Sequence, residues 1–162
     1  MEMWDAYDKD FRQVPGVTLV RGEKIPAGLY HLVCDVLVRH ADGSYLLMQR
    51  DRRKSYGGMW EATAGGSALR GETPAACAAR ELKEETGITP EELREVGRVS
   101  DGNTHYVEFV CRTACAKDSV VLQEGETMAY RWVDVRKLSR MKRSELLTDR
   151  MQQFVRELTG AE

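Results

Sequence analysis

Long apolar runs are missing from this sequence. No stretch approaches the roughly 18 consecutive apolar residues that a membrane-spanning helix needs. Residues 1–10 are charged and aromatic, and they lack the apolar run of a secretory signal peptide. We therefore expect a cytoplasmic protein with no membrane partner.

A strong excess of charge of one sign is also missing. The 162 residues carry 24 Lys and Arg against 26 Asp and Glu, for a formal net charge of −2. This balance provides no broad basic surface for a nucleic-acid polymer. The local basic run at residues 50–54 is either a solvated loop or the edge of a site that attracts phosphate groups.

Paired cysteine motifs are absent as well. Among Cys34, Cys77, Cys111 and Cys115 only one close pair occurs, which fits no zinc-binding pattern. Cys34 lies in an apolar run and Cys77 in a predicted helix. We expect reduced thiols with a mainly structural role.

The pattern that is present predicts one domain over residues 1–162, with neither repeats nor low-complexity tracts. Residues 1–28, which contain Pro and Gly among polar residues, form either an N-terminal strand or a loose arm. A β-hairpin is expected around the turn Ala41-Asp42-Gly43-Ser44. Further elements are expected as follows: hairpin strands at 29–38 and 45–49, a loop at 51–59, a short strand at 60–64, and strands at 94–100, 105–113 and 128–134.

Two helices complete this expectation. Thr73 suits an N-cap, Pro74 the first helical position and Gly87 the residue after the last turn, which predicts a helix over residues 73–86. Apolar residues at helical spacing predict a closing helix over residues 143–158. These apolar residues are Leu146, Leu147, Met151, Phe154, Val155 and Leu158. The order of elements predicts an α/β fold with a mixed sheet packed between helices.

The helix at 73–86 carries an unusual acidic pattern. At about 100° per residue, Glu81, Glu84 and Glu85 share one face, with Cys77 one turn earlier. Ala75, Ala78, Ala79 and Leu82 are expected on the opposite face, against a sheet. Such a face is either solvated surface charge or a set of hard oxygen ligands that suits Mg²⁺ or Mn²⁺. The glycine-bearing segment Ala64-Gly65-Gly66 just before the helix favours the second interpretation.

Residues 66–88 resemble the Nudix box, G-x5-E-x7-R-E-U-x-E-E-x-G-U, in which U is aliphatic. The matching residues are Gly66, Glu72, Arg80, Glu81, Leu82, Glu84, Glu85, Gly87 and Ile88. The resemblance implies an α/β/α sandwich and a divalent-metal-dependent hydrolase of diphosphate linkages in small phosphorylated compounds.

The resemblance also implies residue roles. Glu81, Glu84 and Glu85 correspond to the metal-binding glutamates, and Arg80 to the arginine that orients them. Glu72 and Gly66 correspond to supporting residues of the box. Gly65 occupies the place where some family members offer a backbone carbonyl to the metal, which is expected to be Mg²⁺ or Mn²⁺.

The region before the box is similar to type I isopentenyl-diphosphate isomerase. The similar positions include His31-Leu32, Gly43, Leu46-Leu47, Arg50, Lys54, Gly58 and Trp60. The isomerase, however, needs a Cys acid/base where this chain has Ala64, and a metal-binding His near Gly66. His31 alone matches a metal-binding His of the isomerase, and a single His beside an apolar strand is more typical of a structural residue. The intact box therefore favours hydrolysis over isomerisation.

The identity of the general base stays open among Glu81, Glu124 and Glu126, with Glu81 preferred. Arg50, Trp60 and Tyr106 are candidate substrate-binding residues, because Arg50 can attract phosphate and the aromatic rings can stack on a base; the rings can equally pack in the core. A catalytically idle nucleotide-binding module is a third alternative. We expect a small phosphorylated substrate, and the oligomeric state is left open, with a homodimer as one alternative.

Overall fold

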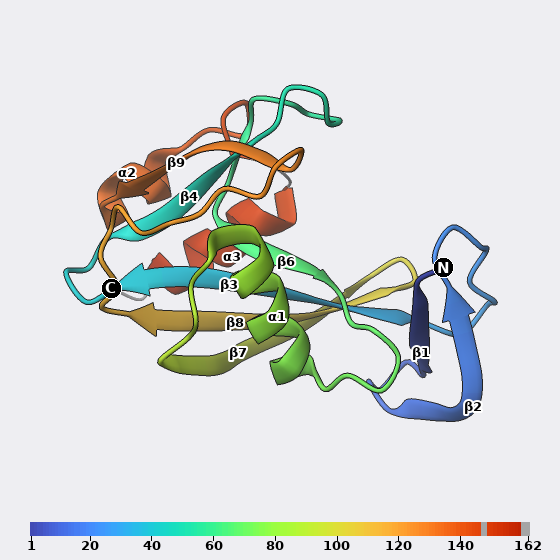
Figure 1. Ribbon diagram of the computed structural model, residues 1–162. Helices are drawn as coiled ribbons and strands as arrows, with labels where there is room; N and C mark the ends of the chain where they lie inside the picture. Colours follow the sequence, from blue (N-terminus) through green and yellow to red (C-terminus); the bar gives the residue numbers. More distant parts are fainter. Residues whose placement is uncertain (147–148, 160–162) are drawn as a thin grey trace.

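The structure is a computed structural model that describes residues 1–146 and 149–159 (Figure 1). A seven-stranded mixed sheet forms its centre, and strands β5, β4, β3, β8 and β7 follow one another across it, while β6 pairs with β3 and β9 with β4. The strands are β3 (His31–His40), β4 (Tyr45–Arg50), β5 (Trp60–Glu61), β6 (Thr63–Ser67), β7 (Glu92–Asp101), β8 (Thr104–Thr113) and β9 (Thr127–Val133).

Strands β3 and β8 form the middle of the sheet and pair in parallel over ten residue pairs, from His31↔Thr104 to His40↔Thr113. Apolar residues alternate between the two faces of β3, so each face has its own core. Val36 packs in the core beneath helix α1 (Pro74–Thr86), whereas Leu37 packs against α2 (Val135–Arg140) and α3 (Asp149–Thr159). The helices therefore cover both faces, and the predicted α/β/α sandwich is confirmed (Figure 1).

The predicted hairpin at residues 29–49 is paired only near its turn. Gly43 has φ +90°, a left-handed conformation that favours glycine, and β3 and β4 are in register at one pair, Arg39↔Tyr45. Beyond that point β5 pairs with β4 and β6 pairs with β3, while β9 pairs with the other edge of β4 from Tyr45 to Arg50. The two strands therefore diverge, and β5 and β6 lie between them.

The helix predicted at residues 73–86 is confirmed as α1. The Thr73 side chain accepts a hydrogen bond from the Ala76 N–H at 3.1 Å, and Gly87 ends the helix at φ 75°. The predicted packing face was wrong in part. Ala75 is exposed, while Cys77 is fully buried beside Ala78, so the inward face is rotated toward the side that also carries Glu81 and Glu85.

Other predicted bounds need correction. The strand expected at 60–64 is divided into β5 and β6, and the closing helix begins at Asp149 instead of residue 143. Leu146, expected in that helix, lies before it and makes a parallel bridge with Trp60; Leu147 is outside the described residues. The short helix α2 was not predicted; it begins after Asp134, whose side chain accepts from the Lys137 N–H at 2.7 Å.

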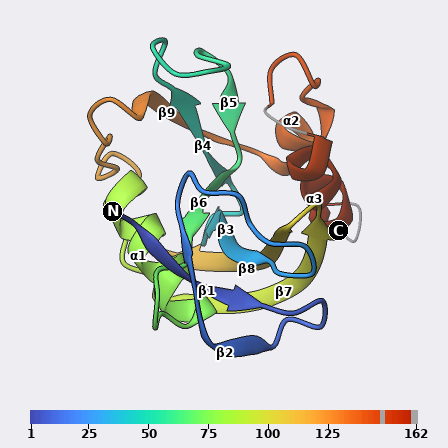
Figure 2. The ribbon, with the colours of Figure 1, turned by 90° about the vertical axis from the view of Figure 1, so that its right-hand side faces the viewer.

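The first part of the chain folds into a separate two-stranded sheet of β1 (Met3–Tyr7) and β2 (Gln13–Val20). This N-terminal hairpin crosses the end of the central sheet (Figure 2). A backbone bridge joins Tyr7 to Tyr30, with both N–H···O distances at 2.9 Å. Segment 1–28, expected to be a strand or an arm, is therefore held against the rest of the molecule.

None of the helices in the described part of the chain combines the length and apolarity needed to pass through a lipid bilayer. All four cysteines are free thiols, and Cys34, Cys77 and Cys111 are buried.

Candidate active site

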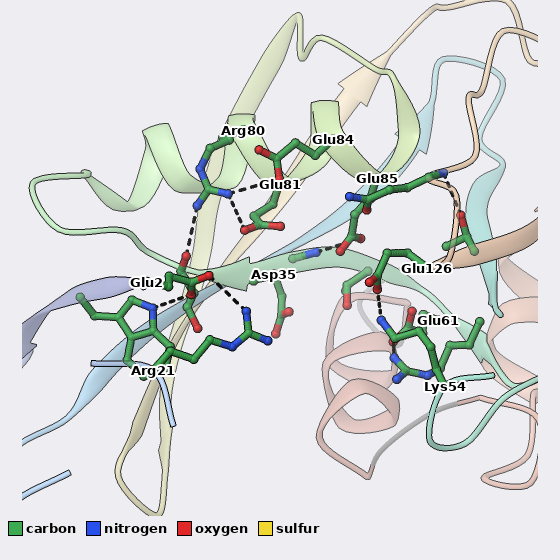
Figure 3. Close-up of a pocket in the computed structure, with 18 residues that line it drawn as sticks. Glu2, Arg21, Asp35, Lys54, Glu61, Arg80, Glu81, Glu84, Glu85 and Glu126 are labelled. Atoms are coloured by element: carbon green, nitrogen blue, oxygen red, sulfur yellow. Dashed lines mark hydrogen bonds and ion pairs between the residues drawn. The ribbon is translucent and has the colours of Figure 1, made fainter. Parts of the chain in front are cut away.

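A cavity of about 630 Å³ opens where α1, β6, β4, β5 and the N-terminal hairpin meet (Figure 3). Most of its lining is charged or polar. The lining residues are Glu2, Trp4, Arg21, Asp35, Arg50, Lys54, Glu61, Thr63, Gly65, Gly66, Ser67, Arg80, Glu81, Glu84, Glu85, Gln123, Glu126 and Thr127. The cavity thus contains Glu81, Glu84 and Glu85 together with the glycine segment that precedes their helix.

The three glutamates of α1 differ in exposure. Glu81 and Glu85 are half-buried and point toward β6, whereas the Glu84 side chain keeps 48% of its surface exposed. Glu85 Oε2 accepts a hydrogen bond from the Gly65 N–H at 3.3 Å. The acidic face therefore divides into an inner pair of carboxylates and an outer one.

The two glycines of β6 make this close approach possible. A Cβ atom at Gly66 would lie 2.5 Å from Glu81 Oε1, and one at Gly65 would lie 2.2 Å from the Cys34 carbonyl and 2.6 Å from Asp35 Oδ1. Because real Cβ atoms do not approach other atoms so closely, any side chain here would displace a carboxylate or the neighbouring strand. The glycines therefore let the backbone of β6 lie directly against these carboxylates.

Arg80 holds the supporting residues in place. Its guanidinium donates to both carboxylate oxygens of Glu72, at 2.7 and 2.9 Å, and to the Ser67 carbonyl at 3.1 Å. It also donates to Glu81 Oε1 at 2.6 Å and to Glu84 Oε2 at 3.4 Å. The hydrogen bond from Arg80 lowers the pKa of Glu72, so Glu72 stays ionised and fixes the arginine.

Burial dominates the electrostatics of the inner carboxylates. It raises the pKa of Glu85 to about 8, and the nearby charges of Glu61 and Glu81 contribute to the same rise. Burial also raises the pKa of Glu81, although Arg80 opposes this effect, and it raises the pKa of Glu61. A group of buried acids with raised pKa values gains most from a bound cation.

The donor set suits a hard divalent cation. Glu81 and Glu85 offer carboxylate oxygens beside the glycines of β6, and Mg²⁺ and Mn²⁺ prefer such oxygen ligands. Within residues 1–146 and 149–159, no three acidic, thiol or imidazole groups already converge at metal-binding distances. In this arrangement one oxygen of Glu81 forms an ion pair with Arg80 at 2.6 Å.

Cations lie along the opposite side of the cavity. Arg50 donates to Glu61 Oε1 at 2.7 Å, and Lys54 forms an ion pair with Glu126 (Figure 3). The structure thus brings two of the predicted residues, Arg50 and Glu126, to the same cavity as the glutamate helix. Glu124 is exposed and does not line the cavity.

The structure does not bring Trp60 or Tyr106 to this cavity. The Trp60 ring packs on the core beneath α2 and α3, and the Arg131 guanidinium lies 4.2 Å from its centroid. Tyr106 belongs to β8, in register with Val33 and Val99. His31 does not line the cavity either; its ring stacks behind it on the lining residue Trp4, at a centroid distance of 4.5 Å.

Several cavity residues were missed by the sequence analysis. Asp35 is buried on β3 within an otherwise apolar run, and that break in the run was the available signal. Glu61 directly follows Trp60 in the predicted strand, without a motif to mark it. The hairpin residues Glu2, Trp4 and Arg21 had no local signal, because their place in the cavity depends on contacts distant in sequence.

Comparison with known proteins agrees with this geometry. The family model described as NUDIX domain matches residues 29–158. A protein of Listeria monocytogenes named as an uncharacterized Nudix hydrolase is 32% identical over 151 residues, which cover 89% of this chain and 86% of that protein.

Two further similarities are to an isomerase, in sequence, and to a crystal structure, in fold. The isopentenyl-diphosphate Delta-isomerase of Streptomyces avermitilis is 37% identical over 89 residues, or 52% of this chain and 45% of that enzyme. The crystal structure of DR0079 from Deinococcus radiodurans superimposes with a TM-score of 0.76 at 17% identity, covering 96% of this chain and 98% of that one.

Proposed function

Because this chain belongs to the Nudix hydrolase family, we propose that it is a Mg²⁺- or Mn²⁺-dependent enzyme that cleaves the diphosphate linkage of a nucleoside diphosphate derivative or a similar small phosphorylated compound. One observation carries the proposal. The inner carboxylates Glu81 and Glu85 lie directly against the glycine backbone of β6, and both line a cavity of about 630 Å³ among charged residues.

Glu81 and Glu85 would hold the cation, with Glu84 and the Gly65 carbonyl as further ligands. When bound, the ion supplies charge neutralisation for the diphosphate and makes water a better nucleophile. Arg80 and Glu72 position Glu81 through their ion pairs at 2.6 and 2.7 Å. These contacts keep one oxygen of Glu81 occupied and leave the other for the reaction.

Hydrolysis requires a water oxygen to form a bond to phosphorus while the bridging P–O bond breaks. The proton of the attacking water passes to a carboxylate, and the leaving phosphate departs with the electron pair of the broken bond. Glu81 is our first choice for this base, because it lines the cavity beside the proposed cation and burial raises the pKa of its carboxyl, which makes it a better proton acceptor. Glu126 is the alternative, since it lines the cavity and is held by Lys54.

Arg50 and Lys54 are suited to the substrate's phosphate groups. Both are cationic and both line the cavity beside the carboxylates. Arg50 also donates to the Ser55 carbonyl at 3.0 Å, which fixes its side chain at the base of the loop at residues 51–59. The residues described around the cavity include a single aromatic ring, that of Trp4, so polar recognition dominates.

Isomerisation of an isoprenoid diphosphate is the rival activity, because similar proteins bear that name. The described residues around the cavity include neither the Cys acid/base nor the metal-binding His of the isomerase. The chain's three histidines and four cysteines all fall within the described residues, and none lines the cavity. Ala64, at the position of the isomerase Cys, is buried and cannot transfer a proton.

A phosphate-release assay tests the proposal. The purified chain is incubated with 5′-nucleoside triphosphates, nucleotide sugars, ADP-ribose and dinucleoside polyphosphates, in Mg²⁺ and in excess EDTA. We expect metal-dependent turnover of at least one compound, and its loss in Glu85→Gln but not in Glu92→Gln, which changes an exposed glutamate on β7. Absence of turnover with every compound would favour an idle binding module, and turnover in EDTA would contradict the metal requirement.

A further inference from the structure

The N-terminal hairpin contributes one wall of the candidate active site. Glu2, Trp4 and Arg21 line the cavity together with the glutamates of α1. Glu2 and Arg21 face each other at the open end of the hairpin, where the Arg21 N–H donates to the Glu2 carbonyl at 3.0 Å. Figure 3 shows the Arg21 side chain extending from this end toward Asp35 and the carboxylates.

Glu2 fixes the direction of Arg21. One oxygen of its carboxylate accepts from Trp4 Nε1 at 2.7 Å, and the other accepts from Arg21 Nη1 at 3.1 Å. Trp4 is itself immobilised, because it is buried and its ring stacks on His31. The guanidinium is therefore aimed by a carboxylate that is held on both oxygens.

The hairpin is attached firmly to the loop that carries the supporting glutamate. The Arg70 N–H donates to the Met3 carbonyl at 2.9 Å, and the Gly71 N–H donates to Asp5 Oδ2 at 2.7 Å. Both contacts lie next to Glu72 in sequence. The wall is thus part of the same rigid arrangement as the glutamate helix, so Arg21 has a defined position relative to the carboxylates.

Arg21 is the most exposed of the four cations that line the cavity. Its side chain keeps 70% of its surface accessible, against 15% for Arg50, 31% for Lys54 and 25% for Arg80. Among the residues that the structure describes, the Arg21 side chain donates to Glu2, and this hydrogen bond uses one of the five donors of a guanidinium. Arginine donors of this kind bind phosphate oxygens in a forked geometry.

We infer that Arg21 is a substrate-binding residue, which contacts a phosphate oxygen of the substrate from the hairpin side of the carboxylates, across from Lys54 and Arg50. This assignment rests on the proposed function for the position of the diphosphate. Glu2 is a positioning residue, because it acts on the substrate only through Arg21. The N-terminal hairpin then determines how the phosphate chain is oriented, in addition to the Nudix box.

Binding of methylenediphosphonate in the presence of Mg²⁺ tests the inference without turnover, because its P–C–P linkage is not hydrolysed. By titration calorimetry we expect Arg21→Ala to weaken binding about tenfold, the lower end of what a charge-assisted hydrogen bond contributes. The affinity of Arg21→Lys should lie between those of the unaltered chain and Arg21→Ala, because lysine keeps the positive charge but cannot form the two parallel hydrogen bonds of a guanidinium. Arg12→Ala is the matched control, because it removes the same charge from an exposed residue between β1 and β2 outside the cavity.

A second readout separates binding from folding and from chemistry. With a hydrolysed substrate, Arg21→Ala should raise KM about tenfold with kcat within about twofold, and Glu2→Gln should raise KM less. Equal affinities of Arg21→Ala and Arg12→Ala for the probe, or no binding by the unaltered chain, would overturn the inference. If the unaltered chain binds the probe through Arg21 but hydrolyses nothing, the proposed function fails while the binding assignment stands.

Discussion

Substituting Glu85 by Gln removes the most strongly perturbed carboxyl of the candidate active site. Its pKa in the folded chain lies at about 8, against an ordinary value of 4.5. Each unit of difference corresponds to about 1.4 kcal/mol, so full ionisation of Glu85 costs the metal-free fold about 5 kcal/mol. The amide has nearly the same shape and no charge, and it keeps an oxygen that can accept from the Gly65 N–H.

The sign of the effect follows from the proton balance. Below pH 4.5 the Glu85 carboxyl is protonated in both the folded and the unfolded chain, so Glu85→Gln and the wild-type chain should differ little in stability. As the pH rises toward 8 the unfolded chain releases this proton first, and the wild-type fold loses stability that the variant keeps. At pH 7 the free energy of unfolding of Glu85→Gln should exceed that of the wild-type chain by at most about 3 kcal/mol. Rotation of the Glu85 carboxylate toward water would make the difference smaller.

Urea unfolding in excess EDTA at pH 5, 7 and 8.5 measures this difference. Glu84→Gln serves as the matched control, since Glu84 is on the same helix but 48% exposed; we expect its effect to stay within about 0.5 kcal/mol. In saturating Mg²⁺ at pH 7 the wild-type chain should be more stable than Glu85→Gln, because the wild-type chain keeps the full set of proposed charged ligands. Identical pH profiles for the two variants in EDTA would refute the conclusion that ionisation of the buried Glu85 carboxyl destabilises the metal-free fold.

Three further predictions concern the reaction. Glu81→Gln should lower kcat at least about a hundredfold with little rescue by added Mg²⁺, since it loses both a ligand and the proposed base; a larger loss from Glu126→Gln, measured beside it, would move the base to the later loop. Gly66→Ala should lower kcat at least about tenfold while the thermal midpoint stays within a few degrees, because the new Cβ displaces only the flexible end of Glu81; unchanged kcat would show that this approach is unimportant. With isopentenyl diphosphate, product analysis should detect no allylic isomer, because Ala64 cannot transfer a proton; formation above background would contradict this.

The sequence was most informative where structure depends on neighbouring residues. Thr73, Pro74 and Gly87 mark the ends of α1 by local capping chemistry, so its bounds were predictable to the residue. The box spacing placed Glu81 and Glu85 one turn apart on that helix, which brought them to one cavity. The N-terminal sheet, by contrast, is attached through pairs such as Gly71 with Asp5, separated by 66 residues.

Trp60 illustrates why candidate substrate-binding residues were harder to predict. A strand alternates its side chains between two faces, and the sequence does not show which face meets the cavity. In the fold Glu61 faces the cavity and Trp60 packs beneath α2 and α3. The pairing of β3 with β4 was hard to predict for a related reason: β5 and β6 take the facing edges of these strands, and the local sequence does not show it.

The N-terminal hairpin is attached to strand β8 through a buried histidine. His105 is fully buried, stacked between Phe11 at 3.8 Å and Tyr30 at 4.1 Å, and its Nε2–H donates to the Asp8 carbonyl at 2.7 Å. Its other ring nitrogen contacts the Ser100 hydroxyl at 2.8 Å, so both nitrogens have partners. Detaching the hairpin would break these contacts with the start of β8, so we expect the backbone amides that pair β1 with β2 to exchange slowly with solvent. The cavity wall that carries Glu2, Trp4 and Arg21 is then expected to keep its position when substrate binds.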